Sequence, residues 1–443
     1  MHGTMAAPAA GSAVSRADVN EARGLVELAG QTATGLVGTV RDMHRAIAGR
    51  PFWALSLAGK PFGPIGAAST VPARFLHDHI SSAVYKGLRS AGSGLASAGG
   101  AAAASLTRQD ARLLTRRPAG ALAAGVLNGF LGDLLEESRN DLLTQIGFHD
   151  GPHQLELERR ALGEALPAAT PRIAVFVHGL WGTEATWRVN WWGTRDAVDY
   201  GQRLRSDLGY TPLYVRYSTG LHVSEAARAL SELLQRTVAE WPVEVGEIAL
   251  FGHSMGGLVS RGACYRAAAE GSTWVEKVRH VFCLGTPHLG APLEKAANVA
   301  GWTLSALPET RPFGAIVNRR SAGIKDLRYG YCCAEDWRDC DPDALLECHR
   351  RDIPFLETAS YYFLGATITR DSQRPLGRLI GDLLVRPSSA WGQGLGGRHY
   401  PFEIERLRTY GGMHHMHLLN HPAVYEQLRG WLSGDPRELP AAA

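Results

Sequence analysis

The stretch IALFGHSMGGLVS, residues 248–260, decides the fold class that the sequence predicts. Its first half is a short apolar run, so 247–251 is predicted to be a buried strand. The residues that follow, 255–270, predict a helix. Ser254 stands between the two, and the chain must therefore turn sharply from strand to helix at this residue.

The residues around this turn form the pattern Gly252-His253-Ser254-Met255-Gly256. A residue at the tip of such a turn has a strained backbone, and side chains two positions to either side would collide. Glycine at positions 252 and 256 removes that collision. The hydroxyl of Ser254 would then lie at the carboxyl edge of a sheet, above a helix N-terminus that favours developing negative charge. The pattern predicts a nucleophile elbow, and the alternative is a tight turn with an inert serine.

Apolar runs alternate with helical patterns from about residue 170 onward. Further strands are expected at 173–177, 212–216, 280–284 and 361–366. Further helices are expected at 224–241, with Ser224 as the N-cap, and from Pro422 onward as a closing helix. Strands that alternate with helices predict an α/β fold, in which helices flank a mostly parallel central sheet.

A second candidate element is VFVHGLWGT, residues 175–183, where a buried strand ends before Gly179. If the serine attacks an acyl group, two backbone N–H groups must face the oxyanion that forms. Met255 would supply one of them. Leu180 would supply the other, because Gly179 allows a close approach of the backbone. His178 is expected to hold this loop by hydrogen bonding, and a catalytic role is the alternative.

Serine alone is a weak nucleophile, so a base and an orienting acid are required. On a fold of this kind the acid follows the serine in the chain, and the histidine follows the acid. Asp382, in the stretch 379–392, is the expected acid, and His415, in the His-rich stretch 413–432, is the expected base. His414 is the alternative base, because only one histidine can reach the serine while facing the acid. The alternative acids are Asp326 and Asp371.

From residue 170 to 432, about 60% of its length, the chain resembles the lipase/esterase branch of the α/β-hydrolases, including lipases with lids and PGAP1-like hydrolases. The motifs that carry this resemblance are VFVHGLWGT (175–183), FGHSMGG (251–257), LGTPHLGAP (284–292), and GDLLVRPSSAWG (381–392) followed by HHMHLLNHP (414–422). The resemblance implies an α/β-hydrolase fold and a serine hydrolase of carboxylic esters. Its triad would be Ser254, Asp382 and His415, and Leu180 and Met255 would be its oxyanion donors.

The substrate that the resemblance implies is an acyl ester or a lipid-like small molecule, and no cofactor is needed. A thioesterase or an acyltransferase on the same fold is an alternative, as is a noncatalytic interaction protein that uses its N-terminal helices. Two positions depart from the family pattern. Leu383 stands where related enzymes often have glycine. His417 stands where some bacterial lipases have an aspartate that binds calcium, so no metal site is expected.

The region 291–358 separates two expected strands by far more than an ordinary loop. We expect it to form a lid over the site, and a plain helical insertion is the alternative. Trp187, Trp191 and Trp192 are candidates for an apolar wall, and ordinary packing is the alternative. Four cysteines crowd into this insertion, where zinc binding, a disulfide and free thiols all remain open: Cys332, Cys333, Cys340 and Cys348.

Residues 1–165 are expected to form a helical N-terminal region, partly of low complexity, with helices at 21–49 and 77–89. The catalytic domain is expected over 166–434, followed by a disordered tail at 435–443. The apolar segment 118–135 has three interpretations: a membrane-spanning helix, a peripheral contact with a membrane or a partner, or a buried helix. The start of the chain shows no secretory signal pattern, which favours a cytoplasmic protein, and membrane association is the alternative.

The composition narrows the function further. The chain has 443 residues and a formal net charge of +3, which argues against binding to nucleic acid driven by bulk charge. Six cysteines are too few for a disulfide scaffold in a chain of this length. A mean hydropathy of −0.12 argues against a polytopic membrane protein. A near-neutral charge fits an uncharged ester substrate.

Overall fold

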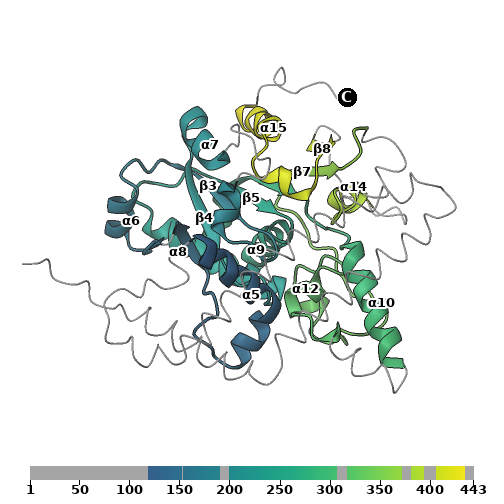
Figure 1. The fold of residues 1–443 in the computed structure, drawn as a ribbon. Helices are drawn as coiled ribbons and strands as arrows, with labels where there is room; N and C mark the ends of the chain where they lie inside the picture. Colours follow the sequence, from purple (N-terminus) through teal and green to yellow (C-terminus); the bar gives the residue numbers. More distant parts are fainter. Residues whose placement is uncertain are drawn as a thin grey trace, which may run out of the picture.

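The computed structural model describes residues 118–151, 153–189, 199–306, 317–371, 381–393 and 406–434. The expected features that lie outside these residues are the helices at 21–49 and 77–89, the tail at 435–443, Trp191 and Trp192. The described part of the chain forms a central sheet with helices on both of its faces (Figure 1).

The sheet has eight strands in the order β2-β1-β4-β3-β5-β6-β7-β8. In chain order they are β1 Gly147–Asp150, β2 His153–Gln154, β3 Arg172–Val177, β4 Thr211–Arg216, β5 Glu247–His253, β6 Val278–Leu284, β7 Ser360–Thr367 and β8 Leu407–Gly411. In the sheet, all neighbouring pairs along β4-β3-β5-β6-β7-β8 are parallel, whereas β1 pairs antiparallel with both β2 and β4. All five strands that the sequence predicts are present, in a mostly parallel sheet.

Helices cover the sheet on both sides. The α-helices are α5 Pro118–Glu137, α6 Arg159–Ala165, α7 Tyr200–Leu208, α8 Val223–Glu240, α9 Met255–Glu270, α10 Pro292–Ala306, α12 Ala322–Asp326, α14 Pro387–Ala390 and α15 Pro422–Ser433. Short 3-10 turns occur at Glu184–Arg188, Thr273–Lys277, Ala334–Asp336 and His415–Leu419. The closing helix α15 begins at Pro422, as the sequence predicts.

The two faces of the sheet bury two separate apolar cores. Successive side chains of a strand point to opposite faces. Val175 and Val177 of β3 therefore belong to the core beneath α8 and α9, whereas Phe176 belongs to the core beneath α7 and α15 (Figure 1). Because both faces are covered, the central strands are continuous apolar runs, which is why they could be recognised in the sequence.

A ladder of aromatic rings crosses the middle of the sheet. Phe176, Phe251, Phe282 and Tyr362 come from four neighbouring strands, and their ring centroids are 4.8, 4.6 and 4.7 Å apart in succession. Stacked aromatic pairs contribute about 0.5–1.5 kcal/mol each beyond the burial of their area. The ladder stiffens the strands whose carboxyl ends carry the candidate site.

The expected start of one helix is wrong. Helix α8 begins at Val223 with His222 as its N-cap, not at Ser224. His222 has φ −54° and ψ 140°, outside the helical region, and Glu225 accepts a hydrogen bond from its N–H at 3.2 Å as part of a capping box. The hydroxyl of Ser224 instead accepts a hydrogen bond from Trp337 Nε1 at 2.9 Å.

The region expected to be helical up to residue 165 also contains strands β1 and β2, and the sheet thus begins before the boundary expected at 166. Phe148 pairs with Val215 of β4 and is 1% exposed. These strands have four and two residues, too few to show a period-2 pattern in the sequence.

Helix α5 occupies the apolar segment 118–135. Its residues Ala121, Asn128 and Leu135 recur at helical spacing and are 3%, 0% and 1% exposed, so one face of the helix is buried. Among the described helices, none is long and apolar enough to cross a bilayer. The helix therefore matches the buried interpretation on one face, and a peripheral contact through its other face stays a prediction.

The long insertion between β6 and β7 contains α10 and α12. A buried ion cluster holds part of it together, since the Glu294 carboxylate lies 2.9 Å from Arg320 and 3.2 Å from Arg328. All six cysteines are free thiols; Cys332 and Cys333 are buried and Cys348 is exposed. Within the described residues, no group of three or more His, Cys, Asp or Glu side chains is arranged to hold a metal ion.

Candidate active site

Ser254 lies at a sharp turn between β5 and α9, with φ 53° and ψ −122°. A non-glycine residue adopts positive φ only where its surroundings impose it, at a cost of about 1–3 kcal/mol. A Cβ at Gly256 would lie 2.2 Å from the Val177 carbonyl oxygen, and a Cβ at Gly252 would lie 2.5 Å from Gly257 Cα. The two glycines thus let the turn pack against β3 and against its own helix.

The backbone of Ser254 is fixed by neighbouring elements. Its N–H donates to the Leu284 carbonyl of β6 at 2.8 Å, and its own carbonyl accepts from Gly257 at 3.1 Å. A Cβ at Gly179 would lie 2.9 Å from Ser254 Cβ, so the loop after β3 passes directly beside the serine. Met255 is the first residue of α9, and its N–H has no partner inside the helix.

Leu180 lies in the loop that follows β3. The Gly182 N–H donates to the Gly179 carbonyl at 3.0 Å, and the Trp181 N–H donates to Thr219 Oγ1 at 3.1 Å. These two bonds fix the peptides on both sides of Leu180. The amide of Leu180 thus lies on the loop after β3 and that of Met255 at the start of α9, and both of these elements adjoin Ser254.

His178 supports this loop from beneath. The residue is fully buried, its Nδ1 lies 2.9 Å from the Gly179 carbonyl oxygen, and its carbonyl accepts from the Tyr217 hydroxyl at 2.9 Å. Its ring stacks on Tyr217 with centroids 4.4 Å apart. Burial lowers the pKa of His178 to about 4, so the imidazole is neutral at pH 7.

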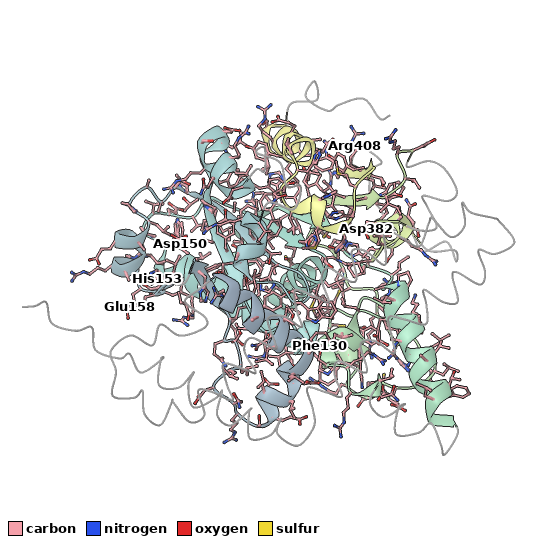
Figure 2. The ribbon with its side chains drawn as sticks, in the orientation of Figure 1. Phe130, Asp150, His153, Glu158, Asp382 and Arg408 are labelled. Atoms are coloured by element: carbon pink, nitrogen blue, oxygen red, sulfur yellow. The ribbon has the colours of Figure 1, made fainter. Side chains whose placement is uncertain are left out.

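Asp382 and His415 form a buried pair. His415 Nδ1 lies 2.7 Å from Asp382 Oδ2, and the two side chains are 2% and 1% exposed. The other oxygen of Asp382 accepts the N–H groups of Leu384 at 3.0 Å and Val385 at 2.7 Å. Three hydrogen bonds therefore fix the carboxylate, which lies beside α14 (Figure 2).

Leu383 stands in the loop that carries the acid and has φ 86°. This is the left-handed region that favours glycine. The loop therefore keeps a glycine-like conformation although this chain has leucine where related enzymes often have glycine. The departure adds backbone strain, and the position of Asp382 is held by its hydrogen bonds.

The ring of His415 lies beside the serine turn, with its centroid 4.6 Å from that of His253. A Cβ at Gly285 would lie 2.8 Å from His415 Cε1, and Gly285 follows the residue whose carbonyl accepts the Ser254 N–H. Among the described residues, Nε2 of His415 is buried and makes no hydrogen bond. His253 Nε2 lies 3.2 Å from the His415 carbonyl oxygen, which fixes the backbone of this histidine.

The alternative residues lie in other contacts. The ring of His414 packs on His417, with centroids 3.3 Å apart. Asp326 accepts hydrogen bonds from His222 at 3.1 Å and from the Val223 N–H at 2.8 Å, at the start of α8. Asp371 is exposed, and its carbonyl accepts from Thr369 Oγ1. The structure therefore brings together Asp382 and His415 and does not bring the alternatives into that pair.

Sequence reasoning missed the residues of α5 that contact the loop of Leu180. The ring of Phe130 stacks on Trp181 with centroids 4.8 Å apart. Gly125, Gly129 and Gly132 face the loops after β3 and β4. The spacing of these glycines, at one helical face, was the available signal for close helix packing.

Buried neutral histidines should make the fold sensitive to acid. The folded-state pKa of His178 is about 4, below the ordinary value of about 6.5 in an unfolded chain. Between these two values the unfolded chain binds a proton that the folded chain does not, so stability is full above about pH 6.5 and falls as the pH drops toward 4. His178 alone would contribute a loss of roughly 3 kcal/mol.

Urea unfolding midpoints between pH 7.5 and 4.5 measure this loss. The variant His178→Gln lacks the titrating group, so its midpoint should fall less steeply over the same window. An identical slope in the two proteins would show that His178 does not cause the acid sensitivity. Burial also lowers the pKa of His149 to about 4, so the variant should retain part of the slope.

The sheet order, the single antiparallel edge and the serine on a sharp turn after β5 define an α/β-hydrolase fold. The profile of the family described as PGAP1-like alpha/beta domain matches residues 201–302, a segment that includes Ser254. No match was found among curated protein sequences.

Solved structures similar to this chain include the mature lipase BlEst2 of Bacillus licheniformis, with 17% identity, a TM-score of 0.35, and coverage of 60% of this chain and 92% of the lipase. An esterase of Pyrobaculum calidifontis shares 16% identity with a TM-score of 0.32, over 60% of this chain and 73% of the esterase. Homoserine O-acetyltransferase of Staphylococcus aureus shares 14% identity with a TM-score of 0.31, over 58% of this chain and 85% of the acetyltransferase chain.

Proposed function

We propose that this chain is a serine hydrolase that cleaves carboxylic esters through an acyl-enzyme. The observation that carries the proposal is the buried Asp382–His415 hydrogen bond of 2.7 Å, which leaves Nε2 of His415 unbonded beside the turn of Ser254. A carboxylate that accepts Nδ1–H holds the imidazole in the tautomer whose Nε2 can take a proton. The Ser–acid–His order along the chain and the conformation of the turn agree with this assignment.

The reaction would proceed in two halves. Nε2 of His415 takes the hydroxyl proton of Ser254 as the serine oxygen attacks the ester carbonyl carbon. The carbonyl oxygen becomes an anion, which the N–H groups of Leu180 and Met255 stabilise. His415 then donates its proton to the departing alcohol, and an acyl-Ser254 ester remains. A water molecule, deprotonated by His415, attacks this ester and releases the acid and the free serine.

The substrate class we propose is an uncharged acyl ester or a lipid-like ester. Thioesters and other acyl acceptors would use the same acyl-enzyme, so they are alternatives within the same chemistry. The insertion 291–358, with α10 and α12, would act as a lid that sets which acyl chains are accepted.

Labelling with a fluorophosphonate tests the assignment of the nucleophile. We expect stoichiometric modification of Ser254 in the purified full-length chain, identified by peptide mass, together with hydrolysis of p-nitrophenyl esters over a range of acyl lengths. The same panel, repeated with thioesters and with an added alcohol as acceptor, separates esterase from thioesterase and acyltransferase activity. A folded protein that takes no label and cleaves none of these substrates would refute the proposal.

A further inference from the structure

We propose that two residues of helix α5, Phe130 and Gly129, are positioning residues for the amide of Leu180. They act through Trp181, which follows Leu180 in the loop after β3. This inference rests on the proposed function, which assigns the Leu180 N–H to the oxyanion. It places a catalytic task on a helix outside the part of the chain where the sequence places the chemistry.

Trp181 holds an unusual backbone conformation, with φ 62°. A bulky residue adopts this conformation only when its surroundings impose it. One constraint is the hydrogen bond from its N–H to Thr219 Oγ1 at 3.1 Å. The other is the ring of Phe130, which stacks on the indole with centroids 4.8 Å apart and planes 28° apart. Trp181 is thus fixed through both its backbone and its side chain, and its N–H belongs to the peptide that joins it to Leu180.

The approach of α5 to this loop depends on glycine. A Cβ at Gly129 would lie 2.2 Å from Trp181 Cδ1, and a Cβ at Gly125 would lie 2.7 Å from the Gly182 carbonyl oxygen. A Cβ at Gly132 would lie 2.5 Å from Ser218 Oγ in the loop after β4. The helix therefore packs directly on the loop of Leu180 and on the loop after β4, whose Thr219 hydroxyl accepts the Trp181 N–H.

The helix is itself anchored at three points. The fully buried Asn128 donates to the Leu142 carbonyl at 2.9 Å and accepts the Thr144 N–H at 2.8 Å. The Ser321 hydroxyl donates to the Gly129 carbonyl at 2.7 Å, and the Ala322 N–H donates to Asp133 at 3.1 Å. These last two bonds tie α5 to α12, which lies beside it in Figure 2 near the labelled Phe130. A helix fixed in this way can hold the indole in place.

Rigidity of the loop matters because oxyanion donors act by preorganisation. A donor must already point at the position that the anionic oxygen will occupy, and its misplacement raises the barrier without weakening binding of the neutral substrate. Loss of the Phe130 ring should therefore lower kcat and leave KM nearly unchanged. A purely structural role for Phe130 would lower the amount of folded enzyme and leave both constants per active site as they were.

The test compares Phe130→Leu with Phe130→Tyr in the full-length chain, with active sites counted by fluorophosphonate labelling. Leucine keeps an apolar side chain but cannot stack, whereas tyrosine keeps the ring. We expect Phe130→Leu to lower kcat by about tenfold with KM within about twofold, and Phe130→Tyr to retain activity near that of the wild type. Leu134→Ala, at a position that is 36% exposed on the same helix, is the control and should keep full activity.

An inhibitor that fills the oxyanion hole gives the second readout. A trifluoromethyl ketone adds to the serine and places an anionic oxygen between the two donors, so its Ki should rise about tenfold in Phe130→Leu. If the wild type is active and Phe130→Leu has the same kcat and the same Ki as the wild type, this inference is wrong, whereas the proposed function is unaffected. A wild-type chain that takes no fluorophosphonate would overturn both. If Phe130→Leu does not fold, Gly129→Ala, which pushes on the indole, must show the same loss of kcat.

Discussion

Replacing Ser254 with alanine should lower kcat for ester hydrolysis by at least about 10⁴-fold, which is the scale seen when a triad serine is removed. The reason is that no acyl-enzyme can form without the hydroxyl, and the remaining donors at Leu180 and Met255 stabilise only a direct attack by water. Initial rates with p-nitrophenyl esters at saturating concentration measure the loss. Fluorophosphonate labelling should disappear in the same protein.

Ser260→Ala is the matched control for this experiment. Ser260 lies on the same helix, α9, is fully buried, and donates its hydroxyl to the Gly256 carbonyl at 2.8 Å. Its removal deletes a buried hydroxyl near the site but no reacting group, so kcat should stay within a few-fold of the wild type. Equal losses in the two variants would mean that packing around α9, and not nucleophilic attack by Ser254, limits the activity.

The sequence predicted the centre of the sheet because its strands are buried on both faces. Runs such as 173–177 and 248–251 are uninterrupted apolar stretches, and glycines mark the turn at Ser254. The outer strands could not be predicted in the same way. The edge strand β8 is only half-buried or exposed along its length, and β2 is exposed throughout. Such strands are specified by pairing with a neighbour, and pairing is not visible in a local pattern.

The candidate site was predictable in its residue types more than in its geometry. A serine, an acid and a histidine in this chain order indicate a triad, but the choice of Asp382 over Asp326 depends on which loops meet in space. Asp326 also binds a histidine, but this is His222, which precedes Ser254 and therefore does not fit the chain order of a triad. The sheet order explains why Asp382 and His415 meet, because it places the loops after β7 and β8 beside each other.

The environment of helix α5, whether buried, interfacial or membrane-spanning, could not be assigned from the sequence for a different reason. Its buried face contains glycine and alanine, and its half-buried face contains residues such as Phe130 and Leu131, so apolar character is spread around the whole helix. A pattern of this kind is shared by buried, interfacial and membrane helices. The close contacts of Gly125 and Gly129 with the loop after β3 decide the matter, and those contacts are tertiary.

Asp382→Asn should lower kcat by about 10³–10⁴-fold while leaving the fold intact. The amide oxygen of asparagine can still accept the N–H groups of Leu384 and Val385, so the loop keeps its shape. The amide nitrogen would instead face His415 Nδ1, where the carboxylate now accepts at 2.7 Å. Because an amide NH₂ donates, Nδ1 must accept, and the ring proton moves to Nε2. The histidine then has no lone pair with which to take the proton of Ser254.

Asp371→Asn is the matched control, because it makes the same chemical change at an exposed aspartate after β7. Its kcat should equal that of the wild type, whereas that of Asp382→Asn should not, with circular dichroism and urea midpoints of both variants close to the wild-type values. A tautomer effect predicts one further difference: Asp382→Asn should still bind a substrate-like ester with nearly the wild-type affinity, since the acid contacts His415 and not the substrate. If Asp371→Asn were the inactive protein, the acid would have been misassigned and the pair of Asp382 and His415 would be structural.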